Sequence, residues 1–240
     1  MSPLRSTVTL PAVVVGLATF LVVLVVGPGL LVAIAAGAVL AVAFARVVSA
    51  RAVGVVRRSL KARPALVGEF PRLHNTIGGL CLTHGIDAPE LFVIDSSAGN
   101  AAAMAGREGT SIVLTTGAAD RLGLVELEAL VAHLLVRCGD DGLTADTTKA
   151  SMGRLAGPRL VAASEAGPDR LMQVDFDGAD LTRFPPGMQT ALQALADLGT
   201  GVDAPRATSR LWLLQPDGRT DVTTPSHPTV EVRVAALGEC

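Results

Sequence analysis

The first sixty residues constrain the fold of this chain most strongly, because they contain an uncharged, apolar stretch from Ser6 to Ala45. At 1.5 Å per residue, a single helix of that length would reach roughly 60 Å, about twice the thickness of the hydrocarbon core of a bilayer. Gly27-Pro28-Gly29 supplies a break, since proline ends a helix and glycine permits a tight reversal. We therefore predict a transmembrane hairpin in residues 1–50, with spans near Thr7–Val26 and Leu30–Ser49.

A cleaved signal peptide is the competing interpretation of this region. Its apolar core would be only about 7 to 15 residues long and would precede a small-residue cleavage site, so the longer, continuous stretch favours the hairpin. Gly16 and Gly37 would permit close packing of helices, but no Gly-x-x-x-Gly pair is present. We therefore expect these small residues to face lipid.

The distribution of positive charge predicts the orientation of the hairpin. Arg5 precedes it, the connecting turn carries no charge, and the basic residues that follow it are Arg46, Arg51, Arg57, Arg58, Lys61 and Arg63. Basic residues mark the cytoplasmic side of a membrane. We predict a multi-pass protein of the cell membrane with both termini and the soluble domain in the cytoplasm. Residues 51–63 are interpreted as a basic juxtamembrane linker in contact with anionic headgroups.

The composition excludes some classes of protein. The chain of 240 residues is 50% hydrophobic and has a formal net charge of −2, which argues against disorder and against nucleic-acid binding. Its three cysteines are an odd number and are not spaced in pairs, which argues against a disulfide framework and suits a reducing compartment. The preference for arginine, alanine, valine and glycine suggests a GC-rich bacterial genome.

The remaining residues, 64–240, have the size of one globular domain. The patterns predict helices over Leu66–His84, Val125–Val136, Pro186–Leu198 and Thr229–Leu237, strands over Glu90–Asp95, Thr110–Thr116 and Arg210–Gln215, and a loop with a short helix over Gly139–Gly167. The fold class is therefore α+β, mainly helical with a small sheet.

The segment from Val131 to Cys138 is similar in sequence to the helix of zinc proteases, but it lacks most of the residues that carry the chemistry. An H-E-x-x-H helix places two histidines one turn apart to bind zinc, and its glutamate activates the metal-bound water. Here only His133 remains, because Leu134 stands at the position of the general base and Arg137 at that of the second ligand. A guanidinium cation repels a divalent metal.

The order of several further segments resembles the membrane-anchored zinc metallopeptidases related to the HtpX heat-shock protease and the CAAX prenyl protease. The segments that carry this resemblance are Gly85–Asp95, Asn100-Ala101-Ala102-Ala103, Ile112–Gly117, Glu126–His133, Leu181–Leu195, and Ser226-His227-Pro228 with Arg233. The resemblance implies a zincin-like metallopeptidase domain behind the membrane hairpin.

The resemblance also implies where the active-site positions lie. The third zinc ligand of the family is the glutamate of a Glu-Ala-Asp triplet, which corresponds here to Gln173-Val174-Asp175, and a neutral glutamine is a poor zinc ligand. A one-residue deletion after His133 would instead place Val136 at the second histidine. The vestigial positions are His133, Leu134, Arg137, Gln173, Asp175 and His227. We therefore expect no catalytic residue, no metal and no cofactor.

Two expectations concern the charges around these positions. Asp175, Asp177 and Asp180 lack the spacing of an EF-hand loop, so an acidic turn in water is the simpler interpretation. If Arg137 is buried, it needs a carboxylate, because an unpaired interior charge is costly. We predict that Asp175 provides it.

Three functions remain open. The leading hypothesis is a non-catalytic pseudoenzyme that binds or regulates a peptide or membrane-protein partner, through a groove at the sheet edge formed by Asn100, Ala101, Ala102 and Ala103. The alternatives are an active zinc metalloendopeptidase of membrane protein quality control and a structural subunit of a membrane complex. Membrane lipids are expected partners and nucleic acid is not, while the oligomeric state stays open.

Overall fold

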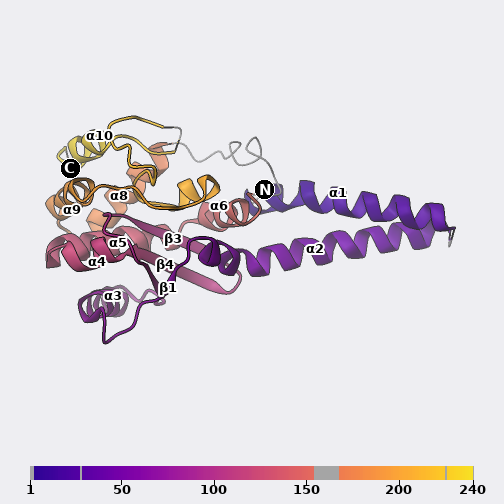
Figure 1. Cartoon of the computed structure of the whole chain (residues 1–240), viewed down its shortest axis with the longest axis horizontal. Coiled ribbons are helices and arrows are strands. Elements are labelled where there is room, and N and C mark those ends of the chain that lie inside the picture. Colours follow the sequence, from indigo (N-terminus) through magenta and orange to yellow (C-terminus); the bar gives the residue numbers. More distant parts are fainter. Residues whose placement is uncertain (1–2, 28, 154–167, 225, 240) are drawn as a thin grey trace.

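The computed structural model describes residues 3–27, 29–153, 168–224 and 226–239. The helices and strands of these residues are α1 Pro3–Val26, α2 Leu30–Ser59, β1 Arg63–Pro64, α3 Pro71–His84, β2 Glu90–Ile94, β3 Ala101–Gly106, β4 Gly109–Thr115, α4 Thr116–Arg121, α5 Leu124–Cys138, α6 Asp141–Ser151, α8 Pro168–Thr182, α9 Pro185–Asp197, the 3-10 helix η1 Arg206–Leu211, and α10 Val230–Leu237. The chain is mostly helical, with one small mixed sheet (Figure 1).

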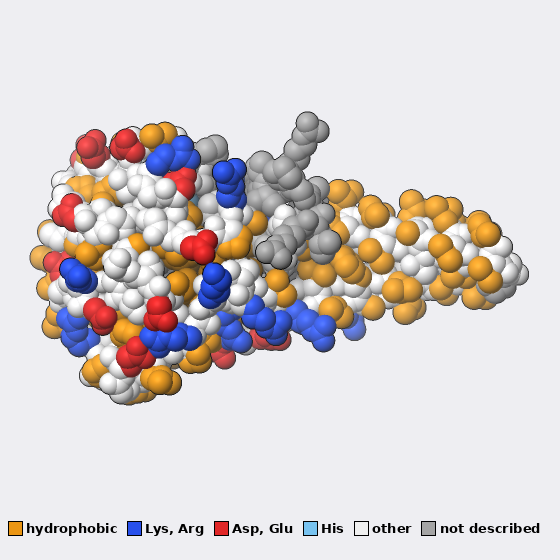
Figure 2. Space-filling model, in the orientation of Figure 1, with side chains coloured by type: hydrophobic (Ala, Val, Ile, Leu, Met, Phe, Trp, Pro, Cys, Tyr) orange, Lys and Arg blue, Asp and Glu red, His pale blue; other side chains and the backbone are white. Residues whose placement is uncertain are grey.

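The first two helices form a hairpin that projects from the rest of the chain (Figure 1). The segments Val8–Val26 and Leu30–Ser59 are long and apolar enough to cross a membrane, and only 17% and 11% of their most apolar windows are buried. A core helix of a soluble protein would be mostly buried instead. Hydrophobic side chains cover the visible face of the projecting hairpin (Figure 2), so the two predicted spans are present as helices and expose their apolar surface.

The two helices of the hairpin approach most closely at glycine. A β-carbon on Gly37 would lie 2.7 Å from the carbonyl oxygen of Gly16, and one on Gly16 would lie 2.9 Å from the carbonyl oxygen of Gly37. Our expectation that these residues face lipid is therefore wrong, because both are buried in the contact between α1 and α2. Small residues serve the packing of the hairpin itself.

Residues 51–59 of the segment that we interpreted as a linker continue α2 without a break, and Arg63 begins β1. Ala52, Val53 and Val56 are buried against the domain. The guanidinium of Arg57 lies 4.4 Å from the centroid of the Phe92 ring, which favours a cation–π contact. A helix therefore joins the hairpin to the domain.

The sheet has the strand order β1-β2-β4-β3, in which β2 and β4 are parallel and the two outer pairs are antiparallel. The predicted strands over Glu90–Asp95 and Thr110–Thr116 are confirmed as β2 and β4. The small-residue segment after β2 forms β3, whose burial is nearly complete. This outer strand carries the segment that resembles the edge strand of the family.

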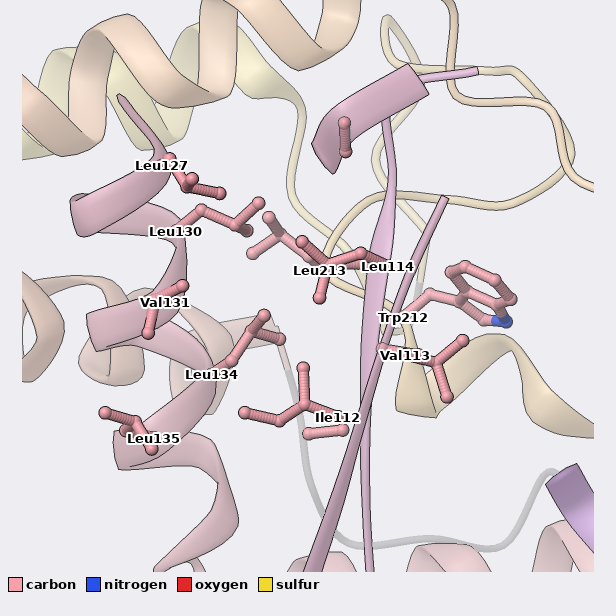
Figure 3. Packing of buried hydrophobic residues seen from close by; sticks show 14 of the residues in the cluster. Ile112, Val113, Leu114, Leu127, Leu130, Val131, Leu134, Leu135, Trp212 and Leu213 are labelled. Carbon is pink, nitrogen blue, oxygen red and sulfur yellow. The ribbon is translucent and has the colours of Figure 1, made fainter. Parts of the chain in front are cut away.

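Helix α5 packs one face on this sheet. Leu127, Leu130 and Leu134 point from α5 toward Ile112 and Leu114 of β4 (Figure 3). Their exposed fractions are 1% or less, so the apolar face of α5 forms the centre of the core. The strong helical pattern of this segment is confirmed.

The other predicted helices are confirmed as α3, α9 and α10, and Gly85 ends α3 with a left-handed φ of 64°. The predicted strand over Arg210–Gln215 is wrong, because the end of η1 overlaps it and Trp212 forms only an isolated bridge to Ala102. The segment over Gly139–Gly167 contains α6, and its residues 154–167 lie outside the described residues.

The acidic stretch that we interpreted as a turn is part of α8, so this expectation is also wrong. Asp175, Gly178 and Ala179 are buried, whereas Asp177 and Asp180 are exposed. The alternation follows the period of a helix, whose inner face carries one carboxylate into the core.

Candidate functional site

The close approach of α5 and α8 brings together two of the positions that we matched to the active site of the family. A β-carbon on Gly178 would lie 2.9 Å from Cα and 3.0 Å from the backbone nitrogen of His133, so only glycine fits there without a shift. This contact places Asp175, one turn earlier on α8, beside the imidazole of His133.

His133 is 1% exposed, and its Nδ1 atom lies 2.9 Å from Oδ1 of Asp175. The two groups are close but poorly aligned, so Nδ1 has no well-directed hydrogen bond within the described part of the chain. Burial lowers the pKa of His133, while the neighbouring Asp175 acts in the opposite direction without outweighing it. The imidazole is therefore neutral at physiological pH.

Asp175 is held by a different cation, Arg233 of α10. Nε and Nη2 of Arg233 each donate a hydrogen bond of 2.6 Å to the carboxylate, and Nη1 donates one of 2.8 Å to the carbonyl oxygen of Leu213. Burial opposes ionisation of the carboxyl, but the charge of Arg233 and the contact with His133 prevail and lower the pKa of Asp175. A buried ion pair therefore connects α8 to α10.

Arg137 pairs with other carboxylates, so our prediction of an Arg137–Asp175 pair is wrong. Its Nη1 donates to Asp140 just after α5, and its Nη2 lies 3.5 Å from Asp146 of α6 and 3.3 Å from the carbonyl oxygen of Arg210. Burial lowers the pKa of Arg137, and Asp146 counteracts this effect. The position that we matched to the second zinc ligand of the family thus belongs to an ion-pair cluster.

Leu134 and Gln173, which we matched to further active-site positions of the family, do not converge on the His133 imidazole. Leu134 is 1% exposed and lies in the core beside Ile112 (Figure 3). Gln173 is exposed on α8, where its Nε2 donates a hydrogen bond of 2.8 Å to Asp177. The structure thus brings His133 and Asp175 together but leaves Gln173 on the surface.

His227 and Arg137 both line a small cavity. The cavity has a volume of about 20 Å³, and its lining residues are Arg137, Asp146, Arg170, Leu171, Arg210, Trp212, Ser226 and His227. A cavity of this size holds about one water molecule. Three arginines and Asp146 line it, and two of these arginines, Arg137 and Arg170, also pair with Asp140.

The His227 imidazole is fixed at both nitrogens. Nε2 lies 2.9 Å from the carbonyl oxygen of Trp212, to which it donates, and Nδ1 lies 3.0 Å from Oγ of Ser226, from which it accepts. Burial, with the charges of Arg233, Arg137 and Arg210, lowers the pKa of His227 to about 4. The residue is a neutral structural contact in the fold.

We expect His227 to make the domain less stable as the pH falls below 6.5. The unfolded chain takes up a proton near its ordinary pKa of 6.5, whereas folded His227 does so only near 4. Between pH 6.5 and pH 5 the free energy of unfolding should fall by about 1.4 kcal/mol per pH unit, about 2 kcal/mol in all. The fluorescence of Trp212, the single tryptophan, reports unfolding of the detergent-solubilised protein.

The His227→Asn variant should lose this contribution, so its free energy of unfolding should decline less between pH 7.5 and pH 5. His84→Asn, at an exposed histidine, is the matched control and should retain the pH dependence of the unmodified protein. Equal slopes for His227→Asn and His84→Asn would contradict the assignment.

The predicted binding edge is covered by the chain itself. Asn100, Ala101, Ala102 and Ala103 are fully buried. The Leu213 amide donates a hydrogen bond of 2.8 Å to the carbonyl oxygen of Ala101, and Trp212 bridges Ala102. A peptide could pair with this edge of β3 only after residues 212–214 moved away.

The side chain of Asn100 holds the covering segment, residues 212–214, against β3 through hydrogen bonds. Its Oδ1 accepts hydrogen bonds from the amides of Ala101 (2.9 Å) and Leu214 (3.1 Å), and its Nδ2 donates to the carbonyl oxygens of Thr200 (3.1 Å) and Leu214 (3.0 Å). The amide side chain is thus satisfied at every position. The sequence marked Asn100 as a groove residue, but its partners lie up to 114 residues away and have no local signal.

The resemblance implies a zinc ion, and these residues do not fit one. His133 is the one suitable donor among the matched ligand positions, since Arg137 carries a positive charge and Gln173 points to solvent. Among the described residues there is no group of three or more histidine, cysteine, aspartate or glutamate side chains that could hold a metal ion. The charged side chains in this region instead form ion pairs with one another.

The exposed apolar hairpin and the small mixed sheet behind it indicate a membrane protein with an α+β domain. Comparison of the sequence with those of known proteins shows which proteins it is similar to. The chain is 26% identical to a protease HtpX homologue of Dictyoglomus thermophilum over 210 residues, which cover 70% of this chain and 69% of the relative. It is 28% identical to a protease HtpX homologue of Acidiphilium cryptum over 249 aligned positions, which cover 84% and 86%.

A protease HtpX homologue of Bacteroides fragilis is 33% identical over a shorter segment of 82 residues, 34% of this chain and 26% of the relative. No family model matches the sequence, and no solved structure matches it. Over most of its length the chain is therefore similar to protease HtpX homologues.

Proposed function

We propose that this chain is a membrane-anchored, HtpX-like protein without peptidase activity, which acts by binding or regulating a peptide or membrane-protein partner. Its domain, residues 64–240, is the zincin-like relative of a metallopeptidase domain. Arg5 near the start of α1 and the basic residues that follow the uncharged stretch favour the cytoplasmic side of the cell membrane for both termini and the domain.

The observation that carries this proposal is the position of Arg137. It stands one turn after His133 on α5, where the family has its second histidine, and its charge is satisfied by Asp140 and Asp146. A fixed guanidinium in that place raises the energy of a divalent cation and offers no lone pair. The core position of Leu134 argues equally against a general base there.

The metal content of the purified protein tests the proposal. We expect the detergent-solubilised full chain to contain far less than one equivalent of zinc, because neither Arg137 nor Gln173 supplies a metal ligand. Elemental mass spectrometry measures the zinc per chain. The His133→Ala variant is the control, and it should show the same trace content as the unmodified protein.

One zinc per chain that is lost in His133→Ala would contradict the proposal. That result would favour the alternative of an active zinc metalloendopeptidase, in which His133 and unrecognised ligands hold the metal. A proteolysis assay with an unfolded membrane-protein substrate would then follow. A metal-free chain without proteolytic activity supports a binding role.

A further inference from the structure

A groove lies between the two helices of the hairpin, at the end that meets the domain. Its volume is about 390 Å³, within the range of about 300–1,000 Å³ that is usual for small-molecule sites. The lining residues are Val8, Thr9, Ala12, Val13, Ala41, Val42, Ala45, Arg46, Ser49 and Arg107. The groove is therefore mostly apolar, and two arginines belong to its wall.

The two arginines come from different parts of the chain. Arg46 is the first charged residue after the uncharged stretch of the hairpin, and Arg107 lies in the turn between β3 and β4. Both are exposed, and neither has an ion pair or hydrogen bond within the described part of the chain. Among the residues that the structure describes, no aspartate or glutamate lines the groove. Basic side chains also gather where the hairpin meets the domain (Figure 2).

The arrangement has an apolar part along the spans and a cationic part where the spans end. In a bilayer this boundary is the level of the lipid phosphates, and basic pockets between transmembrane helices at this level suit anionic headgroups. A free phosphate ion would use the arginines but not the apolar walls. A lipid with a phosphate and an acyl chain uses both.

We propose that this groove binds one anionic phospholipid, with its phosphate at Arg46 and Arg107 and an acyl chain along the wall formed by Ala12, Ala41 and Ala45. The lipid would connect the hairpin to the β3–β4 turn, because its headgroup bridges the two. This site goes beyond the proposed binding function. It requires only that the hairpin lies in a membrane, so its test is independent of the metal content.

Native mass spectrometry of the detergent-solubilised full chain tests the site with phosphatidylglycerol, which is anionic, and phosphatidylcholine, which is zwitterionic. We expect the unmodified protein to retain one phosphatidylglycerol in preference to phosphatidylcholine. The Arg46→Gln/Arg107→Gln variant should lose about 30-fold of this preference, which equals about 2 kcal/mol. That value is the sum of about 1 kcal/mol for each basic side chain.

The Arg51→Gln/Arg58→Gln variant is the matched control. It removes two exposed arginines from the same helix, outside the groove, and should keep the preference. An equal loss in both double variants would overturn the proposal, since it would mean a diffuse attraction between the surface and anionic lipid. The absence of any preference in the unmodified protein would also overturn it.

Filling the groove separates the apolar part from the charge. Ala45→Phe leaves both arginines in place and adds bulk to the wall, so we expect it to displace the retained phosphatidylglycerol. Val47→Phe, at an exposed position outside the groove, should have no effect. Retention by Ala45→Phe at the level of the unmodified protein would overturn the assignment of an acyl chain to the groove.

Discussion

Replacing Arg233 by methionine is expected to lower the free energy of unfolding of the domain by about 3–5 kcal/mol, because it leaves a buried carboxylate without its cation. Asp175 is 1% exposed. The imidazole of His133, which also lies beside its carboxylate, is neutral and supplies no positive charge. Methionine is similar in length but offers no donor to Asp175 or to the carbonyl oxygen of Leu213. Denaturant titration of the full chain in detergent, followed by Trp212 fluorescence, measures the loss.

Arg219→Met is the matched control for this prediction. It makes the same substitution in the pair with Asp217, whose side chains are 64% and 38% exposed, so it should cost at most about 1 kcal/mol. The double variant Asp175→Leu/Arg233→Met should recover much of the stability, since it removes both buried charges together. If Arg233→Met cost no more than Arg219→Met, the buried pair would not be what joins α8 to α10.

The sequence predicted most elements of the fold because their signals are local. The apolar hairpin, β2, β4 and α5 each carry a hydrophobic pattern that no competing signal disturbs. We interpreted the stretch around Asp175 as a turn because its acidic residues dominate the local pattern. The small and apolar residues between them form the buried face of α8. The segment around Trp212 was misread as a strand because its apolar residues pack on β3 without regular pairing.

The partners of the site could be predicted less well than its positions. His133 and Asp175, which we matched to two active-site positions of the family, lie in contact with each other. The cation for Asp175 came from Arg233, which lies 58 residues further along the chain. Arg137 had nearer carboxylates in Asp140 and Asp146, three and nine residues away, and these satisfied it. Pairing between buried charges is decided by the helix packing, which the sequence does not display.

The second large effect is expected at Asn100, where replacement by alanine should cost about 3–5 kcal/mol. The change removes four hydrogen bonds of a fully buried side chain and leaves backbone groups of Thr200 and Leu214 without partners. Each buried group that loses its partner costs about 1–3 kcal/mol. Asn75→Ala, at an exposed position on α3, is the control and should change the stability by less than about 0.5 kcal/mol.

Asn100→Ala also tests whether the edge of β3 can open. The Leu214 amide donates to Asn100, and the adjacent Leu213 amide donates to Ala101, so both amides should exchange with solvent deuterium faster in the variant. Amides of β2 and β4, which the side chain does not contact, should be accelerated only by the loss of global stability. Acceleration at residues 212–214 that exceeds the acceleration in β2 and β4 would mean that this segment can separate from β3, as peptide binding at that edge requires. Equal acceleration at residues 212–214 and in β2 and β4 would contradict a separable cover and would direct the search for a partner to another surface of the domain.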